Sequence, residues 1–596
     1  LALGGNFLTG SRNIGVGYRS GHNVSGGSDN IAIGQDALRT EDSHGKNIAI
    51  GSFALQNLNA GQDGHNIAIG NETGKNMSTG TNNTIVGSLS GDALTSGNNN
   101  TVVGYSALGA ETLGDRSVAI GNFALQVQNN TSNLDVYNVA VGYAAGNQMT
   151  TGVQNVIIGG QAGDALTTGT RNIAIGQSAL GSEDTGSHNV AIGHLALQDQ
   201  DAGDAYNVAV GSNAGKLITT GVENTLLGGK AGDALTTGNY NVAIGMDALD
   251  AEDTGSRNVA IGYNSLKALN YDGNGYNVAV GYEAGKAVTT GLFNTVLGGE
   301  ALLTNQDGDK NTAIGFRALK LFEADTDGHG DNTAVGANAM ENVTTGTENT
   351  AIGRSAMGSG STTGNNNVAI GVSAGLFISS GGDNILIGNF AGDNLDTGSR
   401  NVAIGRNALS AENSEGRTVA VGYEALKSQN ASSDAYNIAI GYQAGRLIST
   451  GTLNTIVGGL AGDQLTTGST SVLLGYNSGG SLTIGSDNVA VGTYALDAED
   501  EHGRNVAVGH ETLGTLNAGA HGYNIAVGYF AAKNLSTGTG NTYLGAEAGQ
   551  NATTGGDNVG VGYKALRGLT TGQANVAIGQ MALNSEDTGS RNVAIG

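Results

Sequence analysis

Histidine and carboxylate side chains are the groups of this chain that could perform acid–base catalysis or hold a metal ion. No His-Glu-x-x-His motif is present, and no grouping of Ser, His and Asp exceeds what sequence repetition produces. The absence of cysteine excludes a disulfide framework, a thiolate zinc site and a cysteine nucleophile. We therefore predict that the protein is not an enzyme, and we assign no catalytic, cofactor-binding or metal-binding residue. The histidines are scattered through expected loops, at His22, His44, His65, His188, His194, His329, His502, His510 and His521.

Two Asp-rich segments carry the residue types of a calcium site. One contains Asp307 and Asp309, and the other contains Asp325, Asp327 and Asp331. Oxygen ligands at alternate positions around a glycine resemble a calcium-binding loop, although the Glu that ends an EF-hand loop is absent. We favour ordinary Asp/Gly turns, with a repeated calcium-binding or ligand-binding module as the alternative.

Tyrosines flank one expected strand in each group of about four repeats. Exposed rows of aromatic rings can bind glycans or protein partners. We favour a structural interpretation, in which the rings form a ladder that covers the corners of the fold. The flanking pairs are Tyr137 and Tyr143, Tyr276 and Tyr282, Tyr436 and Tyr442, and Tyr523 and Tyr529.

Acidic residues outnumber basic ones, which argues against several classes of partner. Asp and Glu total 51 against 26 Lys and Arg, so the formal net charge is −25. Such a surface repels phosphate backbones, and we predict no nucleic-acid binding. Acidic pairs such as Glu183-Asp184 and Glu252-Asp253 are interpreted as solvated charges at corners. No signal peptide or membrane-spanning run is visible, and we expect no membrane contact in this segment.

A single repeat, Asn-x-x-x-Gly, fills the chain from Asn13 to Asn592 in 34 copies. Successive copies usually start 17 residues apart, and otherwise 18, 19 or 21. The Gly is present in every copy, and the Asn is replaced only at Ser117, Thr418 and Ser471. With 103 glycines, no proline and no three-residue period, the composition fits neither an ordinary globular domain nor collagen.

The repeat predicts an all-β parallel solenoid. Glycine inside a helix costs about 1 kcal/mol relative to alanine, so a unit with several glycines is not helical. A short β-branched run closed by Gly and turn residues indicates a strand and a corner, and we predict two short strands and two turns per coil. Thirty-four coils stacked about 4.8 Å apart would form a rod of roughly 160 Å. Proline is absent because each coil's N–H groups are needed by its neighbour.

Individual positions of the unit have distinct expected roles, counted from the Asn as position one. Stacked Asn side chains should form a hydrogen-bonded ladder, and Gly at position five should adopt a positive φ or permit close backbone contact. Position eight is Ala, Ser or Thr, which indicates a tight space. Position nine alternates in pairs between Leu and Gly. After a Gly the missing apolar side chain reappears three residues later, as at Leu94 and Leu166, so we expect the turn type to switch.

Positions two, three and four are apolar or Thr in nearly every copy. Because side chains alternate along a strand, positions two and four share one face and position three points the other way. We predict that position three, which is Ala in 23 of 34 copies, forms an apolar stripe outside the coil. Such a stripe requires cover, so we expect parallel copies to associate, preferably as a closed homotrimer. The alternative is a monomer with a tolerated Ala-rich face.

The strand motif resembles the head repeat of trimeric autotransporter adhesins, the YadA-like head. The resemblance rests on Ser117-Val118-Ala119-Ile120-Gly121, on the same pattern at 401–405 and on Ala at position eight, and it extends along the whole chain. It implies a left-handed parallel β-roll that trimerises around its axis. The unit is longer than the usual head repeat. The pattern is also similar to repetitive phage tail fibres and giant bacterial surface proteins.

These observations lead to one functional prediction. We expect residues 1–596 to be a single continuous solenoid region, excerpted from a longer fibre, because the chain begins and ends within a unit. Its function would be that of a stiff structural or adhesive extracellular segment, on a cell surface or a virion. The alternative is the shaft of a bacteriophage tail fibre. Its main partner would be itself, while any host surface or glycan would be bound through parts outside this sequence.

Overall fold

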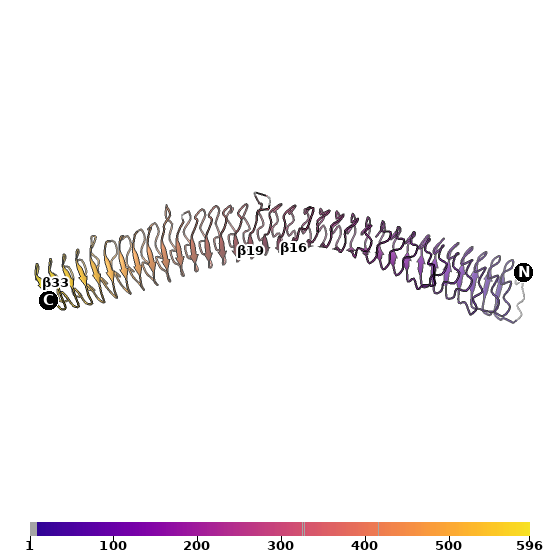
Figure 1. Cartoon of the computed structure of the whole chain (residues 1–596), viewed down its shortest axis with the longest axis horizontal. Helices are drawn as coiled ribbons and strands as arrows, with labels where there is room; N and C mark the ends of the chain where they lie inside the picture. The colour runs from indigo at the N-terminus through magenta and orange to yellow at the C-terminus, as the bar shows by residue number, and fades with distance from the viewer. Residues whose placement is uncertain (1–8, 325, 327, 415) are drawn as a thin grey trace. The chain divides into compact units, whose positions relative to one another are not determined.

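The computed structural model describes residues 9–324, 326, 328–414 and 416–596, which form short β-strands joined by turns and contain no helix. The chain divides into two compact units, Leu1–Phe293 and Asn294–Gly596. Each unit is a parallel β-solenoid in which successive coils follow one another in chain order (Figure 1). The predicted all-β parallel solenoid is therefore confirmed, and the described residues form 34 strands of three residues each.

The first unit contains β1 (Ile14–Val16), β2 (Ile31–Ile33), β3 (Ile48–Ile50), β4 (Ile67–Ile69), β5 (Thr84–Val86), β6 (Thr101–Val103), β7 (Val118–Ile120), β8 (Val139–Val141), β9 (Val156–Ile158), β10 (Ile173–Ile175), β11 (Val190–Ile192), β12 (Val208–Val210), β13 (Thr225–Leu227), β14 (Val242–Ile244), β15 (Val259–Ile261) and β16 (Val278–Val280). The second unit contains β17 (Thr295–Leu297), β18 (Thr312–Ile314), β19 (Thr333–Val335), β20 (Thr350–Ile352), β21 (Val368–Ile370), β22 (Ile385–Ile387), β23 (Val402–Ile404), β24 (Val419–Val421), β25 (Ile438–Ile440), β26 (Thr455–Val457), β27 (Val472–Leu474), β28 (Val489–Val491), β29 (Val506–Val508), β30 (Ile525–Val527), β31 (Thr542–Leu544), β32 (Val559–Val561), β33 (Val576–Ile578) and β34 (Val593–Ile595).

Neighbouring strands within a unit pair in parallel, and the register matches equivalent positions of the repeat. In β10 and β11, Ala174 lies beside Ala191 at position three. The register is the same between β7 and β8, where Ala119 lies beside Ala140 although the two coils start 21 residues apart. Extra residues are therefore accommodated in the turns, and the strand ladder remains uninterrupted there.

The described coils have one strand each, where the sequence predicted two. In the coil that begins at residue 172, the backbone has φ of 51° at Ser178, 54° at Leu180 and 65° at His188. Residues in this left-handed region cannot continue an extended strand. The turn segments still bond to the next coil, since the Leu180 N–H donates to the Ala196 carbonyl at 3.0 Å. The coils are thus hydrogen-bonded to one another through both strands and turns.

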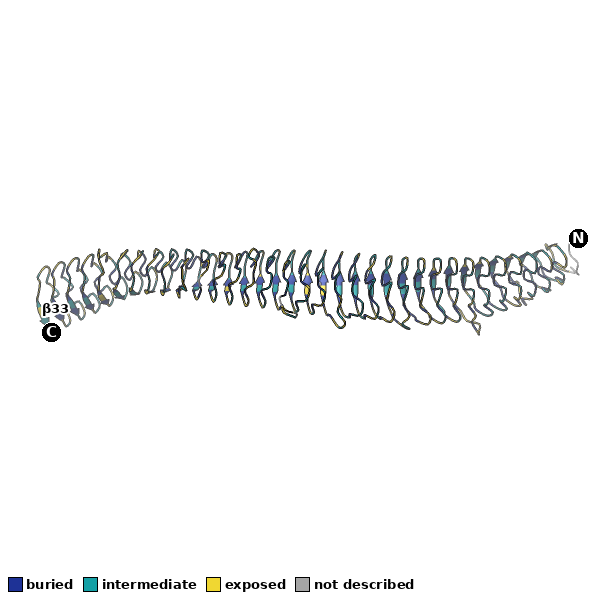
Figure 2. Cartoon of the chain, turned by 90° about the horizontal axis from the view of Figure 1, so that it is seen from above, coloured by how far each residue is buried: buried dark blue, intermediate teal, exposed yellow. Residues whose placement is uncertain are grey.

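The predicted orientation of the strands is wrong. Position three is buried, with Ala174 and Ala191 at 0% exposure, while positions two and four, such as Ile173 and Ile175, are partly exposed (Figure 2). The interior of one coil is narrow, and the strand there faces Ala at position eight and a Leu side chain. Ala fills this space in most copies, and larger side chains such as Ile157, Leu226 and Tyr543 are buried there in coils whose position nine is Gly. The apolar stripe therefore exists, but positions two and four form it.

The alternation at position nine changes which side chains fill the core, while the φ angle at that position stays nearly the same. Leu108 at position nine and Leu94 at position twelve of the preceding coil are both fully buried. The φ angle at position nine is similar, 49° at Gly91 and 48° at Leu108. The turn continues to residue 93 in the first coil, where the Leu94 N–H donates to the Gly91 carbonyl at 3.2 Å, and ends at residue 108 in the second. The Leu125 coil keeps the longer turn, since the Gln128 N–H donates to the Leu125 carbonyl at 3.2 Å, so the predicted switch occurs in only some of the Leu coils. A Cβ on Gly91 would lie 3.0 Å from Leu94 Cδ1, a tight contact, although other coils bury apolar side chains at both positions, as at Leu55 and Leu58.

The predicted Asn ladder is confirmed, with two kinds of hydrogen bond per residue. The Asn172 backbone N–H donates to Asn155 Oδ1 at 2.9 Å, and Asn172 Nδ2 donates to the Gly186 carbonyl at 2.7 Å. The Asn189 N–H then donates to Asn172 Oδ1 at 2.9 Å. Each such Asn therefore joins its own coil to both neighbours.

Candidate functional site

Three clusters of potential metal ligands occur in the described part of the chain, all at the turn that contains positions twelve and thirteen. In each cluster the ligand atoms lie within 4.8 Å of one another, and the first member is a buried glutamate. The clusters are Glu41, Asp42 and His44; Glu499, Asp500 and His502; and Glu183, Asp184 and Asp201.

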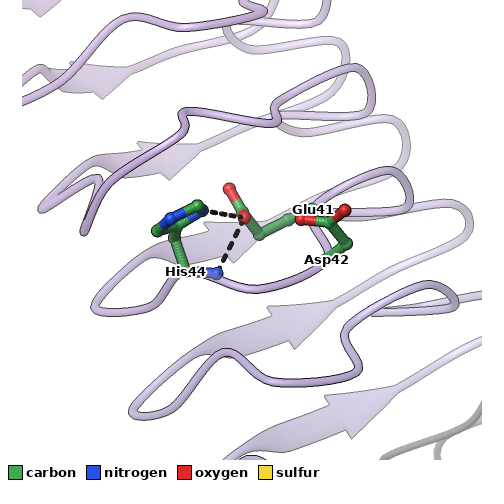
Figure 3. A group of neighbouring side chains, drawn as sticks. All are labelled: Glu41, Asp42 and His44. Atoms are coloured by element: carbon green, nitrogen blue, oxygen red, sulfur yellow. Dashed lines mark hydrogen bonds and ion pairs between the residues drawn. The ribbon is translucent and has the colours of Figure 1, made fainter.

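The Glu41 carboxylate acts as a cap for its own turn. Its Oε1 accepts the His44 backbone N–H at 3.2 Å and lies 3.6 Å from His44 Nδ1, whereas Asp42 points away from this contact (Figure 3). Its Oε2 accepts the Ala60 N–H of the next coil at 3.4 Å. The Asp42 carboxylate instead accepts the Ser43 hydroxyl, which lowers the pKa of Asp42. These bonds give Glu41 a structural role without any bound ion.

The two other clusters follow the same scheme. Glu499 Oε1 accepts the His502 N–H at 3.2 Å and lies 3.5 Å from His502 Nδ1. Glu183 accepts the Gly186 N–H through Oε1 and Gln200 Nε2 through Oε2. The repeat pattern predicts a solvated Glu183-Asp184 pair, but Glu183 is fully buried and only Asp184 is exposed. The repeat contains a signal for this burial. Glu occurs at position twelve, which holds a buried Leu in other coils.

Burial shifts the pKa of these buried glutamates. It raises the pKa of Glu41, Glu183 and Glu499, although backbone N–H donors to the carboxylates act in the opposite direction. Burial also raises the pKa of Glu252 to about 7, at the equivalent turn, where Glu252 Oε1 accepts the Gly255 N–H at 2.7 Å. At Glu252 the neutral and charged forms of the carboxyl group therefore coexist near pH 7.

We expect the coil that contains Glu252 to become more stable as the pH falls from about 8 to about 5. An unfolded Glu has a pKa of about 4.3, so the stabilisation is complete below that value and is lost as the pH rises through about 7. The difference should be about 2 kcal/mol. Hydrogen exchange of residues 241–277, corrected for intrinsic rates, measures it.

Glu252→Gln is the matched variant for this measurement, because it keeps the shape and removes the titrating group. Its dependence on pH should be clearly weaker than that of the wild type. Some dependence should persist, since burial and the neighbouring Asp250 raise the pKa of Asp233 to about 7 in the preceding coil. Identical pH dependence in variant and wild type would contradict the assignment to Glu252.

A glutamine one coil further on accompanies three of the buried glutamates, and sequence analysis missed this pairing. The Gln amide donates to the glutamate Oε2 and its own oxygen accepts the Nδ2 of the next Asn in the ladder. These buried contacts extend the polar ladder across the turn. The donor pairs are Gln128 with Glu111 at 2.9 Å, Gln200 with Glu183 at 3.0 Å and Gln429 with Glu412 at 3.0 Å, and the accepted Asn residues are Asn138, Asn207 and Asn437.

The Asp-rich segments do not assemble a cluster of three potential ligands within the described residues. Asp307 and Asp309 lie in one coil, and the Asp331 N–H of the next coil donates to the Asp309 carbonyl at 3.1 Å. Asp325 and Asp327, the other two residues of the calcium hypothesis, lie outside the described residues.

The tyrosine rows are stacked along the solenoid, so neighbouring groups cover ring faces. Arg257 lies 5.7 Å from the Tyr276 ring centre on one side, and the Phe293 ring stacks at 5.7 Å. In the other row, Tyr263 and Tyr282 stack at 5.5 Å. A glycan usually needs a free ring face, and these rings already have aromatic or cationic neighbours, with Tyr276 48% and Tyr282 55% exposed. This arrangement favours the structural ladder.

Comparison with known proteins identifies no relative: neither a known protein family nor a curated protein sequence matches the chain. Among the described residues, no helix has the length and apolar character needed to cross a membrane.

Proposed function

We propose that this chain is a stiff structural segment of an extracellular fibre, the head or stalk of a surface adhesin of the trimeric autotransporter type. The observation that carries the proposal is the uniform register within each unit, with equivalent residues hydrogen-bonded from coil to coil. Quasi-one-dimensional stacks of this kind resist bending and can be lengthened by duplication of coils. The acidic surface keeps such an extended molecule soluble.

Self-association is part of this proposal, through the outward face of the strands. Positions two and four present one apolar stripe per unit, and Ile385, Ile438 and Ile440 are 40–41% exposed. Monomeric proteins seldom expose contiguous apolar patches larger than a few hundred Å². Three parallel copies that turn this face toward a common axis would bury the stripe symmetrically.

Native mass spectrometry of the whole chain tests the assembly, and we expect three copies per particle. Replacing Ile175, Ile192 and Val210 with Lys places charge on the outward face of three successive coils, and should yield monomers with an unchanged circular dichroism spectrum. In the control, Lys replaces Gln177, His194 and Ser212, which are exposed and follow the corner glycine in the same three coils. A monomeric wild type would remove the assembly from the proposal.

A further inference from the structure

An open groove in the second unit differs from the stacked aromatic rows. It has a volume of about 600 Å³ and runs across successive coils beside the Phe377 ring, which is 47% exposed. Within the described part of the chain, no aromatic ring or cation stacks on Phe377. The other lining residues are Gly360, Ser361, Ser379, Asn394, Asp396, Ala411, Asn413 and Asn430.

Residues with little or no side chain, Gly360 and Ala411, are part of the groove lining. The coil before Phe377 has Gly358 and Gly360 at the turn. A Cβ on Gly360 would lie 1.9 Å from the Ile378 carbonyl oxygen, and one on Gly358 would lie 2.6 Å from the Asn338 oxygen. Side chains therefore cannot occupy these two positions without a shift of the backbone. The small Ala411 leaves space further along the groove.

The groove lining also offers hydrogen-bonding groups of both kinds. The exposed amides of Asn413 and Asn430 make no hydrogen bond with other described residues, so each can donate and accept. Asn394 Nδ2 donates to the Ser410 carbonyl at 2.6 Å, which leaves its oxygen as an acceptor. Asp396 accepts the Ser379 hydroxyl and retains a second carboxylate oxygen.

We propose that this groove binds a short neutral saccharide. One face of a pyranose ring carries C–H groups that pack on an aromatic face, and its rim carries hydroxyls that pair with amides and carboxylates. Phe377 supplies the apolar surface, and Asn413, Asn430 and Asp396 supply the polar partners. Asp396 and the net charge of −25 disfavour acidic glycans. This inference does not depend on the proposed fibre role.

Saturation-transfer difference NMR with the whole chain tests the groove, using cellotriose, maltotriose and triacetylchitotriose at millimolar concentration as neutral probes and sialyllactose as the acidic probe. We expect saturation of ring C–H protons in at least one neutral trisaccharide, with weaker binding of sialyllactose. Phe377→Ala should weaken binding by about tenfold, and Asn413→Ala should also weaken it. Both side chains are exposed, so the fold should tolerate these changes.

Phe390→Ala is the matched control, because Phe390 is also exposed but lies outside the groove lining. It should bind the same probes as the wild type. The proposal is overturned if no neutral probe shows saturation, if Phe377→Ala and Phe390→Ala behave alike, or if sialyllactose binds more tightly than the neutral probes.

Discussion

Replacing Gly159 with Ala should destabilise its coil by at least about 3 kcal/mol, whereas the same change at Gly160 should be neutral or slightly stabilising. Gly159 is the corner glycine at position five, with φ of 140°. A Cβ there would lie 2.4 Å from the Gly176 carbonyl oxygen, the equivalent glycine of the next coil. A Cβ on Gly160 would meet no atom within 4 Å, and its φ lies outside the left-handed region.

The effect of Gly159→Ala should be local, because each coil of a solenoid contacts only its neighbours. Hydrogen exchange of residues 138–190 should therefore increase strongly in Gly159→Ala and remain near the wild-type level in Gly160→Ala. Circular dichroism melting of both variants provides a second readout. If the two adjacent substitutions had equal effects, the corner glycines would owe their presence to something other than backbone contact.

Replacing Asn172 with Ser should lower the free energy of unfolding by about 2–4 kcal/mol, because two buried backbone groups lose their hydrogen-bond partners. These groups are the Asn189 N–H and the Gly186 carbonyl, and a serine side chain is too short to satisfy both. Faster hydrogen exchange of the Asn189 backbone N–H would show directly that this group has lost its hydrogen-bond partner. An unchanged exchange rate at Asn189 would show that the ladder contributes little to stability.

Asn189→Ser is the matched comparison, and its effect should be smaller, about 1–2 kcal/mol, because only one backbone group, the Asn207 N–H that donates to Asn189 Oδ1 at 3.2 Å, loses its partner. The Asn189 Nδ2 is buried without a hydrogen-bond partner, and its coil contains Gln200 at position twelve. The chain already combines Gln128 with Ser117, and Gln128 Nε2 donates to Ser117 Oγ at 3.2 Å. Thr418 and Gln429 form the same pair at 3.1 Å. Equal losses for Asn172→Ser and Asn189→Ser would contradict this explanation.

Local periodicity was sufficient to predict the solenoid, the Asn ladder and the strained corner glycines. Each of these features repeats at every coil, and each depends on constraints that act within one unit or between equivalent positions of adjacent units. The roles of Asn172 and Gly159 could therefore be predicted from the repeat alone. The restriction to small residues at position eight also followed, because Ala179 fills a fully buried space.

The orientation of the strand depended on the tertiary structure. The alternation of side chains along a strand shows only that Ala174 and Ile175 point to opposite sides of it. The space available in the coil interior determines which of the two side chains is buried there. The burial of Glu183 and the groove beside Phe377 likewise arise from groups stacked across several coils. The repeat pattern gives the spacing of these groups along the chain. Whether they are buried depends on how each turn packs against the turn of the next coil.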